Sequence, residues 1–176
     1  MRHIAYALLT AALMAGGIVQ AAAEVRIVAL GASNTYGSGR HGGGVSPSQA
    51  FPAQLEAMLR ARGIAARVSN KGVPGDTTAG MLGRLDSAVP DGTAVVILQP
   101  GGNDVRRAGS GNTTGNITEI QRRLAARHIP VIMLINPGRI APKDSRDPDG
   151  QHFNARGHAA IASWLAPQVA AAERRK

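Results

Sequence analysis

The sequence predicts an α/β fold: a three-layer α/β/α sandwich around a parallel sheet of four to five strands. Short apolar runs have the pattern of buried strands, and they alternate with segments whose apolar residues recur at helical spacing. Such alternation is typical of a parallel sheet covered by helices on both faces. The 176 residues are enough for one domain with a sizeable core.

Four apolar runs predict the strands. The clearest is AVVILQ, because it is rich in β-branched residues and leucine, which suit a sheet buried on both faces. The others are shorter or less uniform. In chain order, the predicted strands cover residues 25–30, 66–70, 94–99 and 131–135.

Helices are predicted between and after these strands. The first is stopped by Gly63 and the second by Pro90, while Pro167 should kink or interrupt the last. Their apolar faces cover residues 51–59, 81–89, 117–124 and 161–169. No internal repeat or long linker divides the chain, so we expect one domain after the N-terminal segment.

The composition suits a globular protein and excludes several functions. Aromatic residues make up 3% of the chain, so the core must be aliphatic, with Trp164 as its largest piece. The absence of cysteine excludes disulfides and thiolate metal sites. The net charge is +9, but the basic residues are scattered and lack stacking aromatics, so we expect no nucleic-acid partner.

The first 23 residues have the pattern of a secretory signal peptide. Arg2 precedes a nearly continuous apolar stretch, and three alanines at 21–23 supply small residues for cleavage. The alternatives are a membrane anchor or a buried first helix, but the stretch is short for a span and ends in small residues. We therefore expect export to the periplasm or medium, a mature chain of residues 24–176, and no stable membrane insertion after cleavage.

Polar segments follow the strands where a parallel sheet binds ligands, at the carboxyl ends of its strands. The first predicted strand, 25–30, runs directly into Gly31, Ala32 and Ser33, so a nucleophile could be presented there. Four such segments belong together: GASN (31–34), NKGVPGDTT (70–78), GGND (101–104) and DGQH (149–152).

In this order, the four segments resemble the sequence blocks of the SGNH hydrolases, also called GDSL lipases and esterases. The resemblance covers the mature chain and implies a flavodoxin-like sheet and ester hydrolysis without a metal or organic cofactor. Similar proteins include small exported arylesterases and lysophospholipases of the acyl-CoA thioesterase I type. One departure is Ala32, where the usual first block has Asp, so the hydrogen bonding of the turn is in question; Asn34 is a candidate to supply part of it.

The chemistry explains why these residue types are needed. A serine hydroxyl needs a base to take its proton, and an imidazole suits this role near neutral pH. Asp149 lies three residues before His152, close enough to orient its ring. By the resemblance, Ser33, Asp149 and His152 are catalytic, and the oxyanion hole is formed by the backbone N–H groups of Ser33 and Gly75 and the side chain of Asn103.

Other histidines compete with His152 for the role of base, and one glycine-rich segment resembles a dinucleotide-binding motif. His41 lies in a glycine-rich loop near Ser33, whereas His128 should be a surface loop residue and His158 a packing or capping residue. GSGRHG (37–42) fits a dinucleotide-binding pattern, but it neither ends the strand nor opens a helix.

The predicted substrate is a small ester or thioester. The segment after the fourth strand indicates which acyl groups the site could accept. Residues 136–148 are proline-rich and charged, so they predict an exposed loop rather than a further helix and strand. The cleft should then be shallow, with the loop 37–44 as its flexible cover, and should favour short-chain or aryl esters. The alternatives are a carbohydrate O-acetyl esterase and a non-catalytic binding module of the same fold. Acyl length, leaving group and oligomeric state stay open.

Overall fold

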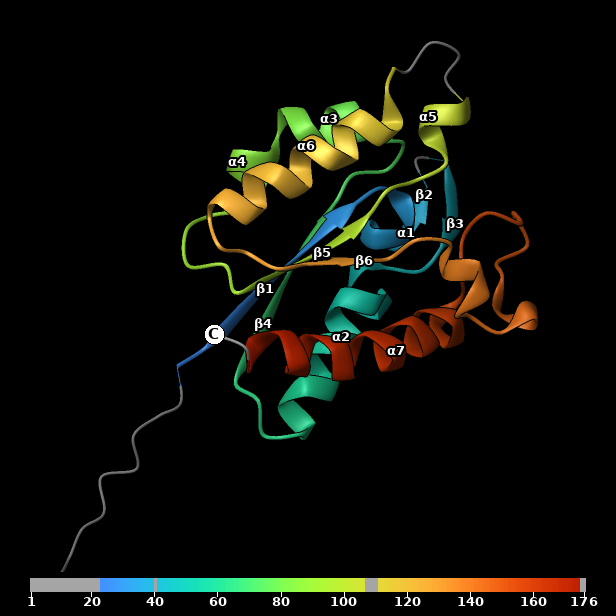
Figure 1. The fold of residues 1–176 in the computed structure, drawn as a ribbon. Coiled ribbons are helices and arrows are strands. Elements are labelled where there is room, and N and C mark those ends of the chain that lie inside the picture. Colours follow the sequence, from blue (N-terminus) through green and yellow to red (C-terminus); the bar gives the residue numbers. More distant parts are fainter. Residues whose placement is uncertain (1–22, 40, 107–110, 175–176) are drawn as a thin grey trace, which may run out of the picture.

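The computed structural model describes residues 23–39, 41–106 and 111–174. The expected signal segment lies almost wholly outside these residues. Figure 1 shows a sheet in the middle of the fold with helices on both of its faces. Within the described residues, no helix combines the length and apolar character that crossing a membrane requires.

The central sheet consists of four parallel strands, as predicted. They are β1 (Val25–Gly31), β4 (Ala66–Gly72), β5 (Val95–Gln99) and β6 (Val131–Met133). Their order is β4-β1-β5-β6. In this register Gly31, the last residue of β1, lies beside Gly72 and Gln99, so three strands end together at one edge.

The helices divide between the two faces of this sheet (Figure 1). Helices α2 (Phe51–Ala61) and α7 (Ala155–Glu173) pack on one face, and α3 (Thr78–Gly83), α4 (Leu85–Ala88) and α6 (Thr113–Ala126) cover the other. The segment expected to form one helix over 81–89 is instead two short helices that meet at Arg84.

We expected Pro167 to kink or interrupt the last helix; α7 runs through it, so an interruption there was wrong. A proline removes the hydrogen bond to the carbonyl four residues earlier, which belongs to Ser163. Ser163 is exposed, so water can satisfy that carbonyl and the helix can continue.

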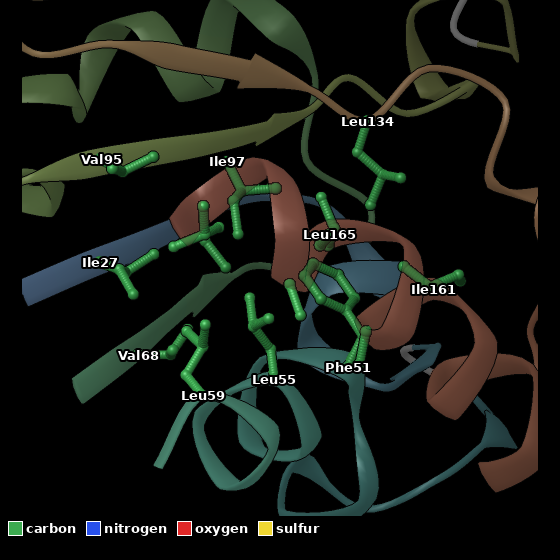
Figure 2. Packing of buried hydrophobic residues seen from close by; sticks show 14 of the residues in the cluster. Ile27, Phe51, Leu55, Leu59, Val68, Val95, Ile97, Leu134, Ile161 and Leu165 are labelled. Carbon is green, nitrogen blue, oxygen red and sulfur yellow. The ribbon is translucent and has the colours of Figure 1, made fainter. Parts of the chain in front are cut away.

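Apolar side chains form two layers, one on each face of the sheet, because successive side chains of a strand point to opposite faces. These two layers stabilise the fold. Figure 2 shows the layer formed by α2 and α7 against the sheet, where Phe51, Leu55 and Leu165 are fully buried around Ile27 and Ile97. The other layer is separate and packs α3, α4 and α6 on the opposite face.

Trp164 does not belong to this core, contrary to the prediction. Its side chain is 41% exposed on α7, and the largest buried side chains are Phe51 and Phe153. Helical spacing placed Trp164 beside true core positions, but the turn of the helix carries it toward solvent.

Short elements gather at the edge where the strands end (Figure 1). They are α1 (Ser33–Tyr36), the hairpin of β2 (Ser38–Gly39) and β3 (Gly42–Gly44), and α5 (Asn103–Arg106). The chain between β6 and α7 adds two 3₁₀ turns, Pro137–Arg139 and Lys143–Ser145, and no further helix and strand unit, as predicted. This edge carries the four polar segments.

Candidate active site

Ser33 lies where β1 turns sharply into α1. The turn is held from the neighbouring strand by Gln99, whose Oε1 accepts hydrogen bonds from Thr35 Oγ1 at 3.1 Å and from the backbone N–H of Ala32 at 3.4 Å. Thr35 and Gln99 are both buried, so these bonds are shielded from water. The serine is thereby placed at the end of the sheet, as predicted.

Gln99 supplies the hydrogen bonds of this turn for which Asn34 was a partial candidate. Asn34 reaches away instead, and its Nδ2 donates to the backbone oxygen of Gln151 at 3.4 Å. Ala32 is buried in the apolar layer, where an aspartate would be costly. The sequence did hold a signal for Gln99, since it is the polar residue that ends the apolar strand AVVILQ.

Asp149 and His152 form a hydrogen-bonded pair. The ring Nδ1 of His152 contacts Asp149 Oδ2, and the backbone N–H groups of Gln151 and His152 each donate to Asp149 Oδ1 at 2.9 Å. Burial raises the pKa of Asp149, but the hydrogen bonds from the His152 ring and from these two N–H groups outweigh it and lower the pKa to about 2. The ionised carboxylate holds the proton of the ring on Nδ1, which leaves Nε2 free to act as a base.

The glycine-rich hairpin packs directly against this pair. A side chain at Gly39 would collide with the His152 ring, and one at Gly43 would collide with the Asp149 carboxylate. The hairpin therefore packs as a wall against the Asp149–His152 pair and is not only a cover over the cleft. The described glycines of GSGRHG lie in or beside this hairpin and open no helix, which removes the dinucleotide-binding alternative.

Gly75 and Asn103 lie at the ends of the neighbouring strands. Gly75 has a φ of 77°, a conformation that favours glycine, in the turn between β4 and α3. The side-chain amide of Asn103 donates one proton to the backbone oxygen of Asp76 at 2.8 Å, and its second proton is available to a ligand. The next residue, Asp104, is buried and accepts a hydrogen bond from Thr78 Oγ1 at 2.5 Å, which anchors α5 to α3.

All five predicted site residues line one cavity of about 380 Å³: Ser33, Gly75, Asn103, Asp149 and His152. Within the described residues no hydrogen bond joins Ser33 to His152, a separation often seen in enzymes without substrate. Ser33 also lines a second cavity of about 340 Å³, which shares only Ser33 and Arg106 with the first.

The remaining histidines are less suited to be the base. His41 lines the first cavity but is exposed, and no carboxylate among the described residues contacts it. His128 is exposed at a turn with a φ of 54°. Both observations favour His152, the histidine with a carboxylate partner.

His158 is a packing residue, as predicted. It is fully buried, its ring stacks on Phe51 and meets Phe153 edge-on, and its Nδ1 accepts from the Phe51 N–H at 3.2 Å. Burial lowers the pKa of His158 to about 4, assisted by the charge of His152 and opposed by the nearby Gly37 carbonyl.

The site offers acid–base and nucleophilic groups rather than metal ligands. Among the residues that the structure describes, no three His, Asp or Glu side chains gather as a metal ion would require.

Comparisons with known proteins show what the chain and its fold are similar to. The profile of the GDSL-like lipase/acylhydrolase family matches residues 29–172. The structure of AlinE4, an esterase of the SGNH-hydrolase family, is 31% identical with a TM-score of 0.55, over 86% of this chain and 75% of that one. No curated protein matches the sequence.

Two more distant structures share the fold. A protein of Desulfitobacterium hafniense DCB-2 assigned to the lipolytic G-D-S-L family is 16% identical with a TM-score of 0.64, over 82% of this chain and 99% of that one. The psychrotrophic esterase EstA of Pseudoalteromonas sp. is 17% identical with a TM-score of 0.60, over 85% of this chain and 94% of that one.

Proposed function

The chain belongs to the GDSL-like lipase/acylhydrolase family and is a carboxylic ester hydrolase, and we propose that Ser33 is its nucleophile, with His152 as base and Asp149 as the group that orients it. The observation that carries this assignment is the Asp149–His152 pair, which opens into the same cavity as Ser33. The backbone N–H groups of Ser33 and Gly75 and the amide of Asn103 are assigned to the oxyanion hole.

In the first half of the reaction, the Ser33 hydroxyl gives its proton to His152 Nε2 while its oxygen bonds to the ester carbonyl carbon. The carbonyl oxygen gains negative charge and accepts hydrogen bonds from the oxyanion donors. His152 then passes its proton to the leaving alcohol as the carbon–oxygen bond breaks. The acyl group remains on Ser33.

The second half repeats these steps with water. Water gives a proton to His152, its oxygen bonds to the acyl carbon, and the bond to Ser33 breaks as His152 returns the proton to the serine. The products are a carboxylic acid and the alcohol. Asp149 stays ionised throughout, in line with its lowered pKa.

Hydrolysis of p-nitrophenyl acetate by the Ser33→Ala variant tests the nucleophile. We expect kcat to fall by roughly a thousandfold or more, because the remaining groups cannot form an acyl-enzyme. Ser48→Ala, at an exposed serine outside both cavities, is the matched control and should keep wild-type activity. If Ser33→Ala kept more than about a tenth of the activity, the nucleophile would be another residue.

The size of the site supports a preference for short-chain or aryl esters, including thioesters. The two cavities are only about 340 and 380 Å³, and glycine and polar residues form most of their lining. A long alkyl chain would therefore bury little of its surface. A panel of p-nitrophenyl esters of increasing chain length should give its highest kcat/KM at the short end; a maximum at long chains would contradict this preference.

The N-terminal segment is the basis for a proposal about where the protein acts. We propose that residues 1–23 direct secretion, on the basis of their charge and apolar pattern. N-terminal sequencing of the protein from the periplasm or medium should begin at Glu24, and a cytoplasmic protein that retains Met1 would contradict it.

A further inference from the structure

Three arginine side chains line the second cavity beside Ser33: Arg106, Arg139 and Arg146. They come from α5, from the 3₁₀ turn after β6, and from the loop before α7, so only the fold brings them together. No Asp or Glu residue lines this cavity. The cavity therefore carries concentrated positive charge next to the proposed nucleophile.

Two of these side chains are held in place. The Arg146 guanidinium lies over the Phe153 ring, 4.9 Å from its centroid, and donates to the Gly150 carbonyl at 3.3 Å. Arg106 donates to Gln151 Oε1 and, at 3.4 Å, to Asn103 Oδ1. Holding the arginines before a ligand arrives reduces the entropy lost on binding.

None of the three is neutralised by a carboxylate within the described part of the chain. Other arginines of the chain do have carboxylate partners: Arg84 pairs with Asp76, Arg122 with Glu119 and Arg156 with Asp144. Each guanidinium at the cavity has five N–H donors and uses at most two of them in the described contacts, which leaves donors for an anion.

The geometry of the tetrahedral intermediate indicates which part of the substrate enters the second cavity. The tetrahedral carbon has four substituents: the Ser33 oxygen, the oxyanion, the leaving oxygen and the acyl chain. The oxyanion must face Gly75 and Asn103, and the leaving oxygen must face His152, and all three line the first cavity. The acyl chain is the substituent left to enter the second cavity.

We propose that the preferred substrates are monoesters of short dicarboxylic acids, whose free carboxylate binds Arg106, Arg139 and Arg146 while the ester lies on Ser33. Arginine forks match a carboxylate in a bidentate geometry, which makes this anion a suitable partner. One water is consumed per turnover, and the dicarboxylate, the alcohol and one proton are released. The inference rests on the proposed function of Ser33.

Proton release from pairs of matched methyl esters tests this inference. The probes are monomethyl succinate, glutarate and adipate, each beside the analogue in which a carboxamide replaces the free carboxylate. For at least one pair, we expect kcat/KM to be about tenfold higher for the acid, because exposed charge pairs each contribute a few-fold and three arginines share the anion. Added salt should reduce this preference.

Arginine variants show whether the preference arises in this cavity. Arg139→Gln and Arg146→Gln should each lower the acid-to-amide ratio of kcat/KM about twofold, and the double variant should lower it about fivefold, which leaves the contribution of Arg106. Arg122→Gln removes a guanidinium on α6 that lines neither cavity, and it should keep the wild-type ratio.

The outcomes separate this inference from the proposed function. An acid-to-amide ratio near or below one in the wild type would overturn the anion preference, and turnover of p-nitrophenyl acetate in the same preparation would leave Ser33 as nucleophile. A high ratio that both arginine variants retain would overturn the assignment to this cavity. Loss of turnover on every ester, including p-nitrophenyl acetate, would overturn both.

Discussion

The two cavities that share Ser33 differ in what lines them. The first contains His152, Asp149, Gly75 and Asn103, the groups that we propose move protons and stabilise charge. The second contains none of these and is lined instead by arginines, prolines and the Phe153 ring. The difference supports our proposal that the chemistry takes place on one side of Ser33 and that the acyl group is selected on the other. Substitutions in the first cavity should change kcat, and those in the second should change which substrate is preferred.

The largest effect is expected from the Asp149–His152 pair. Asp149→Asn should lower kcat by roughly 10⁴-fold, because the amide would hold the ring in the wrong tautomer, and His152→Ala should do at least as much. The assay is p-nitrophenyl acetate hydrolysis, with circular dichroism to confirm folding. His128→Ala, at an exposed turn, is the control and should be active. If His41→Ala abolished activity and His152→Ala did not, the base would be His41.

Asn103→Ala should have the next largest effect. Loss of one oxyanion donor costs roughly 100- to 1000-fold in kcat, while KM should change little because the donor acts mainly in the transition state. Steady-state kinetics on a neutral ester separate the two parameters. A change in KM alone would move Asn103 from the chemistry to substrate binding.

Gly43→Ala tests whether the hairpin supports the first cavity. The added methyl group would collide with the Asp149 carboxylate, and a displacement of about 1 Å can cost roughly 100-fold in rate. Gly42→Ala is a matched control, because Gly42 also has a positive φ but has no atom near the position of a Cβ. Equal losses of kcat in both variants would mean that backbone strain, not contact with Asp149, is responsible.

The smallest effect concerns stability, outside both cavities. Burial lowers the pKa of His158 to about 4, against 6.5 for an exposed histidine, so the unfolded chain binds more protons between these values. The contribution of His158 to the free energy of unfolding should therefore be constant above about pH 6.5 and fall by on the order of 3 kcal/mol as the pH drops to 4. Urea denaturation across this range measures it, and a His158→Phe variant should show a smaller fall. An unchanged pH dependence in that variant would assign the proton to another group.

The sequence predicted the sheet and its helices because apolar periodicity reports burial directly. The four strands lie where their apolar runs lie, and Phe51 begins the helix that was expected. The same signal misplaced Trp164, since a position at the margin of an apolar face can be turned toward solvent. Local periodicity also did not predict that α7 would continue through Pro167.

The candidate site was predictable where its residues occur in compact segments, such as Asp149 and His152. Contacts between distant segments were not. Gln99 holds the turn at Ser33 from a neighbouring strand, and Gly43 makes room for Asp149 across more than half of the chain. The arginines of the second cavity belong to a helix, a 3₁₀ turn and a loop that are separate in the sequence, so only the folded chain shows that they share a cavity.

The central claim is that Ser33 is the nucleophile activated by His152, and covalent trapping tests it most directly. The protein is treated with an organophosphonate, and the adduct is located by mass spectrometry of the intact chain and of its peptides. The account predicts a single adduct on the peptide that contains Ser33, absent in Ser33→Ala and formed much more slowly in His152→Ala. An adduct on another residue, or full labelling of Ser33→Ala, would contradict it.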